Sequence, residues 1–143
     1  MDTTEKIDTK TAVIWVDAEG MVHLKMKEGA VVDLQEIEKH FDIYRQLGCD
    51  KNSTLHLFEG GAYFTFEKEA MQYASKHSKN LFVASAIVNT SLAVRLLVNL
   101  YNLFFNNTYN FKMFNSKGEA LQWLRKFKKA EKFSKAIQGN EIM

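Results

Sequence analysis

Residues 91–106 combine eleven apolar residues with only five polar ones, and the spacing of the polar ones predicts a helix. At about 100° per residue, the polar positions fall within an arc of about 80° that contains no apolar residue. A surface helix ordinarily has the opposite pattern, a narrow apolar stripe on a polar cylinder. We therefore expect this helix to be covered on nearly every side, by its own fold, by a second subunit or by a ligand. The polar positions are Ser91, Arg95, Asn99, Asn102 and Asn106.

Composition and charge limit the compartment and the class of partner. The 143 residues suit one domain with one core. The net charge is +2, and because residues 125–143 carry six Lys/Arg against two Glu, the rest of the chain is close to neutral. This balance excludes a general nucleic-acid-binding role. The single cysteine, Cys49, cannot form an internal disulfide, and no signal-like apolar segment follows Met1, so we expect a cytoplasmic protein.

The apolar run at 91–106 is too short to cross a bilayer. A helix of this length spans about 24 Å, whereas the hydrocarbon core of a membrane is about 30 Å thick. Arg95 also interrupts the run. We therefore predict no integral membrane segment.

Strand-like and helix-like segments alternate along the chain after an opening hairpin. Asp33 with Glu36, and Ser116 with Glu119, have the spacing of capping boxes, and Thr65 is a plausible N-cap for a helix that reaches about His77. The order predicts an α/β fold: a mixed, mostly parallel five-stranded sheet with four flanking helices, arranged β-β-α-β-α-β-α-β-α. The predicted strands are residues 12–16, 21–27, 54–58, 81–88 and 110–114, and the predicted helices follow residues 33, 65, 91 and 116.

The element order, the turn Glu59-Gly60-Gly61 and the segment 82–99 (FVASAIVNTSLAVRLLVN) resemble the SpoIIAA-like (STAS) superfamily, in particular its small stand-alone bacterial members. The resemblance covers roughly residues 11–129. It implies a mixed sheet flanked by helices and a non-enzymatic role. We accordingly expect a flexible N-terminus over residues 1–10, a single domain over 11–129 and a basic, polar tail over 130–143.

The resemblance also offers a modification site. In the anti-sigma-factor antagonists of that family, a partner kinase phosphorylates a serine at the junction between the loop after the third strand and the next helix, usually within an Asp-Ser pair. This chain has Tyr63-Phe64-Thr65-Phe66-Glu67 there. Thr65 is the hydroxyl residue nearest that position, and no acidic residue precedes it.

The carboxyl ends of the predicted parallel strands are candidates for an anion site. Ligands of open α/β sheets tend to bind at these ends, and helix N-termini favour negative charge. A plain structural interpretation competes, in which Thr65 and Ser91 are N-caps, the glycines form a turn and Arg95 lies in solvent. The candidate anion-site residues are Glu59, Gly60, Gly61, Thr65, Asn89, Ser91 and Arg95.

Aromatic and leucine side chains gather on the 59–66 loop and on the predicted helix 91–106. They belong to the core, or they form an apolar patch larger than a monomer normally exposes. The patch predicts a homodimer, or a small apolar pocket between the second and third helices. The residues of this predicted interface or pocket are Phe64, Phe66, Leu97, Leu100, Tyr101 and Phe104.

No residue pattern indicates catalysis, a metal or a cofactor. The four histidines lie at no metal-ligand spacing; we expect His40 to be exposed and His56 to be a core or edge residue of a strand. His56 and Glu59 form a conceivable acid–base pair, but no nucleophile accompanies them. We predict a non-enzymatic interaction domain that acts through the third helix and the 59–66 loop, is homodimeric and needs no cofactor. The alternative is a carrier of a small lipid or other apolar ligand.

Overall fold

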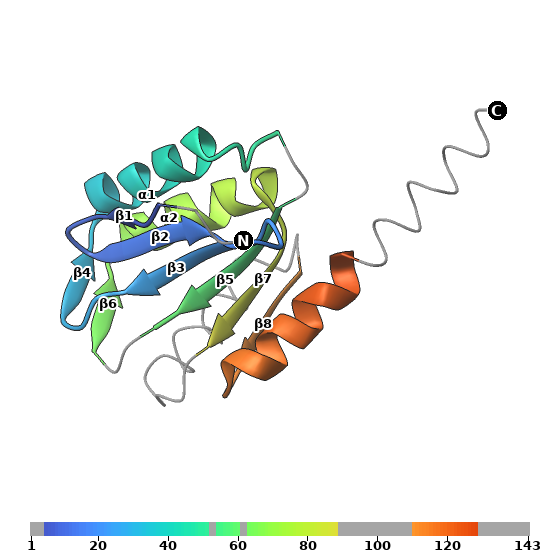
Figure 1. Ribbon diagram of the computed structural model, residues 1–143. Helices are drawn as coiled ribbons and strands as arrows, with labels where there is room; N and C mark the ends of the chain where they lie inside the picture. The colour runs from blue at the N-terminus through green and yellow to red at the C-terminus, as the bar shows by residue number, and fades with distance from the viewer. Residues whose placement is uncertain (1–4, 52–53, 61–62, 89–109, 129–143) are drawn as a thin grey trace.

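The fold has three layers, with a central sheet between helices. The computed structural model describes residues 5–51, 54–60, 63–88 and 110–128. Helices α1 (Leu34–Gln46) and α2 (Lys68–His77) cover one face of the sheet, and a helix over residues 117–128 covers the other (Figure 1). We call these the helix-pair face and the single-helix face. A short 3-10 helix, η1 (Ser78–Asn80), follows α2 directly.

The main sheet has six strands in the order β1-β2-β3-β5-β7-β8. The first three strands pair antiparallel, and every pair from β3 to β8 is parallel. A separate two-stranded sheet joins β4 and β6 in parallel. The bounds are β1 (Ile7–Asp8), β2 (Ala12–Val16), β3 (Val22–Met26), β4 (Ala30–Val32), β5 (Thr54–Glu59), β6 (Phe64–Phe66), β7 (Phe82–Val88) and β8 (Asn110–Phe114).

The predicted α/β architecture with a mixed, mostly parallel sheet is confirmed, although the strand count differs. The sequence predicts five strands, whereas the structure adds β1 to the main sheet and forms β4 and β6 beside it. Strand β1 lies within the predicted flexible N-terminus, and the flexibility of residues 1–10 stays a prediction. Ile7 and Asp8 pair with Ile14 and Val13, because the Ile7 side chain packs against the apolar core. The predicted helix 91–106 and the tail 130–143 lie outside the described residues.

Helix α1 begins where its capping box predicts. The Asp33 carboxylate accepts a hydrogen bond from the Glu36 backbone N–H at 2.8 Å, which satisfies a free donor of the first turn. Gly48 follows the helix with a φ of +86°, a conformation that favours glycine. Between these ends, Ile37, Phe41 and Tyr44 form the buried stripe. Likewise, the hydroxyl of Ser116 accepts from the Glu119 N–H at the start of helix 117–128.

The predicted N-cap at Thr65 is wrong, because Thr65 lies in strand β6. It pairs with Val31 of β4, and helix α2 starts only after Glu67. The alternation Phe-Thr-Phe has the period of a strand: Phe64 and Phe66 pack against the core, while Thr65 is exposed. Pairing with β4 thus makes residues 64–66 a strand, although the sequence alone predicts that a helix starts there.

Candidate functional site

A cavity of about 130 Å³ lies on the helix-pair face, between the sheet and helices α1 and α2. Strand register explains why its floor is apolar. Leu24, Phe58 and Ile87 are register partners on β3, β5 and β7, so their side chains point to the same face. Helices α1 and α2 and strand β6 contribute much of the remaining wall, with side chains that include Phe41, Tyr44, Met71, Ala74, Phe64 and Phe66. None of the described lining residues is Asp, Glu, Lys or Arg.

His56 of β5 is a polar residue in the cavity wall, and both of its ring nitrogens have partners. Nε2 lies 3.2 Å from the Tyr44 hydroxyl, and Nδ1 lies 3.0 Å from Ser85 Oγ. The ring also stacks on Phe82, with centroids 4.2 Å apart. Burial lowers the pKa of His56 to about 3. The imidazole is therefore neutral at physiological pH and brings no charge to the cavity.

An irregularity between β5 and β7 brings both Phe82 and Ser85 to His56. Residues three apart on a regular strand point to opposite faces. Here Thr54 pairs with Phe82, but the next residue, Leu55, pairs with Ala84. The extra residue on β7 shifts the alternation, as a β-bulge does. Two residues of β7 therefore contact the same imidazole: Phe82 stacks on the His56 ring, and Ser85 forms a hydrogen bond with it.

His40 of α1 is the second histidine in the cavity wall, and it is fully buried, so its predicted exposure is wrong. Its Nε2 lies 2.7 Å from Thr11 Oγ1, and the Thr11 hydroxyl donates to Glu36 Oε1 at 2.8 Å. Because the single hydroxyl proton goes to Glu36, Nε2 carries the histidine proton and donates it to Thr11. Nδ1 is then an acceptor, and it has no hydrogen-bond partner.

The charge state of His40 follows from the same surroundings. Burial lowers the pKa of His40 to about 4, although the nearby Glu36 carboxylate opposes the shift. The ring is neutral at physiological pH. Glu36 and His40 are spaced by four residues along α1, a signal that is visible in the sequence, but nothing there reveals that Thr11 joins them.

The residues predicted for an interface or pocket separate into two groups. Phe64 and Phe66 line the cavity. The other four predicted residues lie outside the described residues: Leu97, Leu100, Tyr101 and Phe104. The pocket between the second and third helices therefore stays a prediction. The described cavity is bounded instead by α1, α2 and the sheet.

The residues predicted for an anion site are only partly described. Glu59 forms an ion pair with Lys117 at 3.1 Å and so faces helix 117–128, on the opposite side of the sheet from the cavity. The Gly60 N–H donates to the Val88 carbonyl. Thr65 is exposed on β6. The other members of the predicted site, Gly61, Asn89, Ser91 and Arg95, lie outside the described residues, and the anion site stays a prediction.

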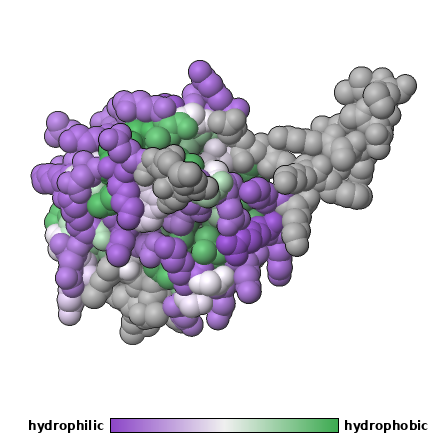
Figure 2. Space-filling model, in the orientation of Figure 1, coloured by the Kyte–Doolittle hydropathy of each residue, from purple (hydrophilic) through white to green (hydrophobic). Residues whose placement is uncertain are grey.

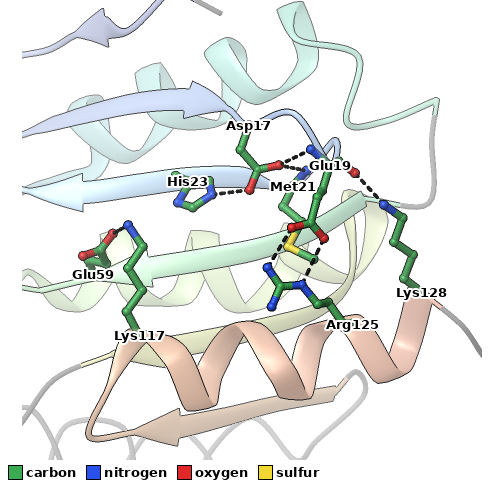
Figure 3. A network of polar contacts seen from close by, with 8 residues as sticks. All are labelled: Asp17, Glu19, Met21, His23, Glu59, Lys117, Arg125 and Lys128. Atoms are coloured by element: carbon green, nitrogen blue, oxygen red, sulfur yellow. Dashed lines mark hydrogen bonds and ion pairs between the residues drawn. The ribbon is translucent and has the colours of Figure 1, made fainter. Parts of the chain in front are cut away.

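A second polar cluster lies on the single-helix face and fastens helix 117–128 to the β2–β3 turn (Figure 3). Arg125 holds the Glu19 carboxylate with two hydrogen bonds, at 2.7 and 3.1 Å, and Lys128 donates to the Glu19 carbonyl. The hydrogen bond from Arg125 lowers the pKa of Glu19. Asp17 accepts from the turn N–H groups of Glu19 and Met21 and lies 2.7 Å from His23 Nε2. We interpret these contacts as structural, because they hold helix 117–128 against the β2–β3 turn.

Two classes of site find no support in the described part of the chain. No group of three or more His, Cys, Asp or Glu side chains within it is placed to hold a metal ion. None of the helices within it has the length and apolar content that a bilayer span requires.

Comparison with known proteins places the chain in a family. Residues 14–128 match the model of the domain of unknown function DUF7793, and the chain belongs to that family. No curated protein matches the chain. A crystal structure of an uncharacterized protein of the DUF3478 family from Shewanella loihica PV-4, described as having a SpoIIAA-like fold, superposes with a TM-score of 0.54. The two chains are 16% identical, and the match covers 85% of this chain and 92% of the other. The SpoIIAA-like fold predicted from the sequence is thus confirmed.

Proposed function

We propose that this DUF7793 chain is a binding domain, rather than an enzyme, and that it holds a small uncharged ligand in the cavity beneath α1 and α2. The observation that carries the proposal is the cavity itself, about 130 Å³ in volume, with aromatic and aliphatic walls and no charged side chain among its described lining residues. Ligand sites are typically concave and mostly apolar, with few polar groups.

The electrostatics of the cavity support an uncharged ligand over an anion. Both histidines of its wall are neutral at physiological pH, since burial lowers the pKa of His40 to about 4 and that of His56 to about 3. An ionised ligand would lose its hydration there without gaining a counter-charge. An apolar ligand gains about 25 cal/mol for each Å² of surface it removes from water. The SpoIIAA-like fold contributes the scaffold, and fold alone does not select a ligand.

Extraction of the purified protein with organic solvent, followed by mass spectrometry, tests the proposal. We expect a small uncharged molecule in the wild-type extract. Ala74→Leu, which adds three carbons beside the cavity, should remove the molecule, while Gln72→Leu, which adds a leucine at an exposed position of the same helix, should retain it. A ligand-free wild-type protein that also binds no apolar probe at millimolar concentration would contradict the proposal.

A second candidate function is protein interaction of the STAS type through the 59–66 loop. Three large apolar side chains in the described part of the chain are strongly exposed: Tyr63 (72%), Val31 (56%) and Leu34 (42%). They lie around the β4–β6 sheet, where the Gly29 N–H donates to the Tyr63 carbonyl. In the view of Figure 2, hydrophilic residues cover most of the coloured surface and hydrophobic ones form small separate areas, which suits a local contact.

This second function includes the predicted homodimer and the predicted phosphorylation of Thr65. Light scattering of the wild type and of Tyr63→Ser tests the first: a dimer that the substitution dissociates would favour the interaction domain, and a monomer in both would count against self-association through this loop. The exposure of Thr65 on β6 is compatible with a kinase reaching it. Incubation with lysate and ATP, followed by phosphopeptide mapping, tests that modification.

A further inference from the structure

We infer that the outer face of the β4–β6 sheet binds the basic segment 129–137 of a second copy of this chain, and that Phe133 is the residue seated on that face. The inference is independent of the cavity and its ligand. It deepens the second candidate function, protein interaction through the 59–66 loop, and rests on it. Three properties carry it: the register of the two strands, the charge around them and the reach of the basic segment.

Strand alternation gives the β4–β6 sheet an apolar outer face. Phe64 and Phe66 of β6 pack against the core, so the residues between and before them point outward. Val31 of β4 pairs with the residue between the two phenylalanines and is exposed on the same outer side. Tyr63, directly before β6, and Leu34, two residues after β4, add exposed apolar side chains at its margins. We call Val31, Leu34 and Tyr63 the outer patch.

Acidic residues predominate around the outer patch. Segments 28–39 and 63–69, which carry it, contain six acidic residues and two lysines. One of the six, Glu36, is buried. The other seven groups form no ion pair within the described part of the chain: Glu28, Asp33, Glu38, Glu67 and Glu69, with Lys39 and Lys68. Five carboxylates against two ammonium groups leave a negative surface, which favours a cationic partner.

The basic segment has the complementary composition. Residues 129–137 (KAEKFSKAI) follow the last described residue and contain three lysines and one glutamate. Phe133 lies between Lys132 and Lys135 in this segment. Buried aromatic side chains supply much of the affinity of an interface, and complementary charges around them orient the partner. A phenylalanine flanked by lysines therefore matches an apolar patch surrounded by unpaired carboxylates.

The reach of the basic segment favours a second copy over the same chain. Helix 117–128 ends beside the β2–β3 turn, where Lys128 donates to the Glu19 carbonyl. Because β4 follows the other end of β3, the outer patch lies at the opposite end of the sheet (Figure 1). Phe133 is five residues beyond Lys128 and reaches at most about 18 Å from it, which is about the length of β3 alone. Two copies that exchange their basic segments occupy both patches in one twofold arrangement.

Sedimentation equilibrium of the full-length chain and its variants tests the inference. We expect a wild-type dimer. Tyr63→Ser on the patch and Phe133→Ser on the basic segment should each raise its dissociation constant at least about tenfold, because each removes one side of both contacts. Ile142→Ser, a matched control outside the basic segment, should change it by less than about twofold. Raising the salt from about 0.05 M to about 0.5 M should weaken the wild-type dimer, since salt screens the charges.

A mixture of two variants tests the exchange between copies directly. The Tyr63→Ser chain keeps an intact basic segment, and the Phe133→Ser chain keeps an intact patch. Mixed in equal amounts, they can form a pair with one intact contact. Association should therefore reappear in the mixture, although neither variant associates alone. Circular dichroism checks that each variant is folded, and Val31→Ser replaces Tyr63→Ser if the latter is not.

The outcomes separate this inference from the function on which it rests. Loss of the dimer in both variants and its return in the mixture support the inference. A mixture that does not associate, or a dimer sensitive to Tyr63→Ser alone, overturns it and leaves the patch as an interface of another kind. A wild type that is monomeric at millimolar concentration also overturns it and leaves a different protein as the partner. A dimer sensitive to neither substitution overturns it and counts against the second candidate function as well.

Discussion

The two faces of the sheet are packed by different means. On the single-helix face, three fully buried alanines, Ala84, Ala86 and Ala120, let helix 117–128 approach the strands closely. On the helix-pair face, Phe41, Phe58 and Phe66 stand between the sheet and its helices, and a cavity is left among them. Small side chains allow close contact of backbones, whereas large planar ones hold two elements apart. One sheet therefore has a closely packed side and a side with room for a ligand.

The faces also differ in their polar groups. The single-helix face has its Lys and Arg ion pairs toward the margin, where Arg125 holds Glu19 and Lys117 holds Glu59, and it also contains the buried His23 beside Asp17. The helix-pair face has neutral histidines buried among aromatic rings. Exposed ion pairs contribute little because water and salt screen them, whereas burial opposes the protonation of His40 and His56 and lowers their pKa values. The helix-pair face should therefore respond to acid, and the single-helix face to side-chain volume.

The largest expected effect is a loss of stability in acid that originates on the helix-pair face. The pKa of His40 is lowered to about 4 and that of His56 to about 3 in the folded chain, against about 6.5 when unfolded. The unfolded chain binds more protons between these values, so stability falls as pH drops from about 6.5 toward 4 and 3. Each histidine contributes a slope of up to about 1.4 kcal/mol per pH unit.

Urea denaturation at several pH values measures this slope. His56→Gln should flatten it between pH 6 and 4, because a neutral amide takes no proton. An unchanged slope in that variant would show that folding does not lower the pKa of His56. It would contradict the expectation that the helix-pair face is the acid-sensitive one.

Truncation of the packed core on the other face should have the next largest effect. Leu124 is fully buried on helix 117–128, so Leu124→Ala should lower the free energy of unfolding by about 3 kcal/mol. Gln122→Ala, at an exposed position of the same helix, should change it by less than about 0.5 kcal/mol. Urea midpoints at pH 7 compare the two. Equal losses would mean that this helix is not packed as described.

Enlarging an alanine side chain should lower stability by different amounts on the two faces of the sheet. Ala86→Leu inserts a larger side chain where the helix lies close to the sheet and should cost about 1–3 kcal/mol. Ala74→Leu makes the same addition beside the cavity and should cost less, since the cavity receives the new atoms. Thermal unfolding of both variants measures the difference. A larger loss for Ala74→Leu would contradict the contrast in packing.

The smallest expected effect belongs to the ion pair at the margin. Arg125→Gln removes the two hydrogen bonds to Glu19. Because both side chains are exposed, this substitution should lower stability less than Leu124→Ala or Ala86→Leu does. The difference from wild type should disappear at about 1 M salt, where the screening length falls to about 3 Å. If the loss of stability persists at high salt, it comes from packing of the aliphatic part of the Arg125 side chain and not from the ion pair.

Several local features could be predicted from the sequence because they depend on near neighbours in the chain. The Asp33 and Ser116 caps act over three residues, and Gly48 ends α1 through its own φ angle. The alternation of strands and helices was likewise visible, and it led to the SpoIIAA-like fold. The predicted helix cap at Thr65 is wrong because its strand exists only through pairing with Val31, which lies 34 positions earlier.

The candidate site depended on contacts that no short-range pattern encodes. The sequence identifies Phe64 and Phe66 as apolar contact residues, but their place in a cavity wall requires β6 to lie beside β4. Helical periodicity predicts an exposed His40, because it does not show that Thr11 covers that side of α1. The meeting of His56 with both Phe82 and Ser85 depends on a shifted register between β5 and β7.

By itself the sequence determined an α/β fold, the alternation of its main strands and helices, and the caps at Asp33 and Ser116, since hydrophobic period and capping are properties of neighbouring residues. The tertiary structure alone decided which histidines are buried, where β6 pairs and that a space remains under α1 and α2. These features arise where side chains far apart in sequence compete for the same volume, and only the assembled fold sets the outcome of that competition.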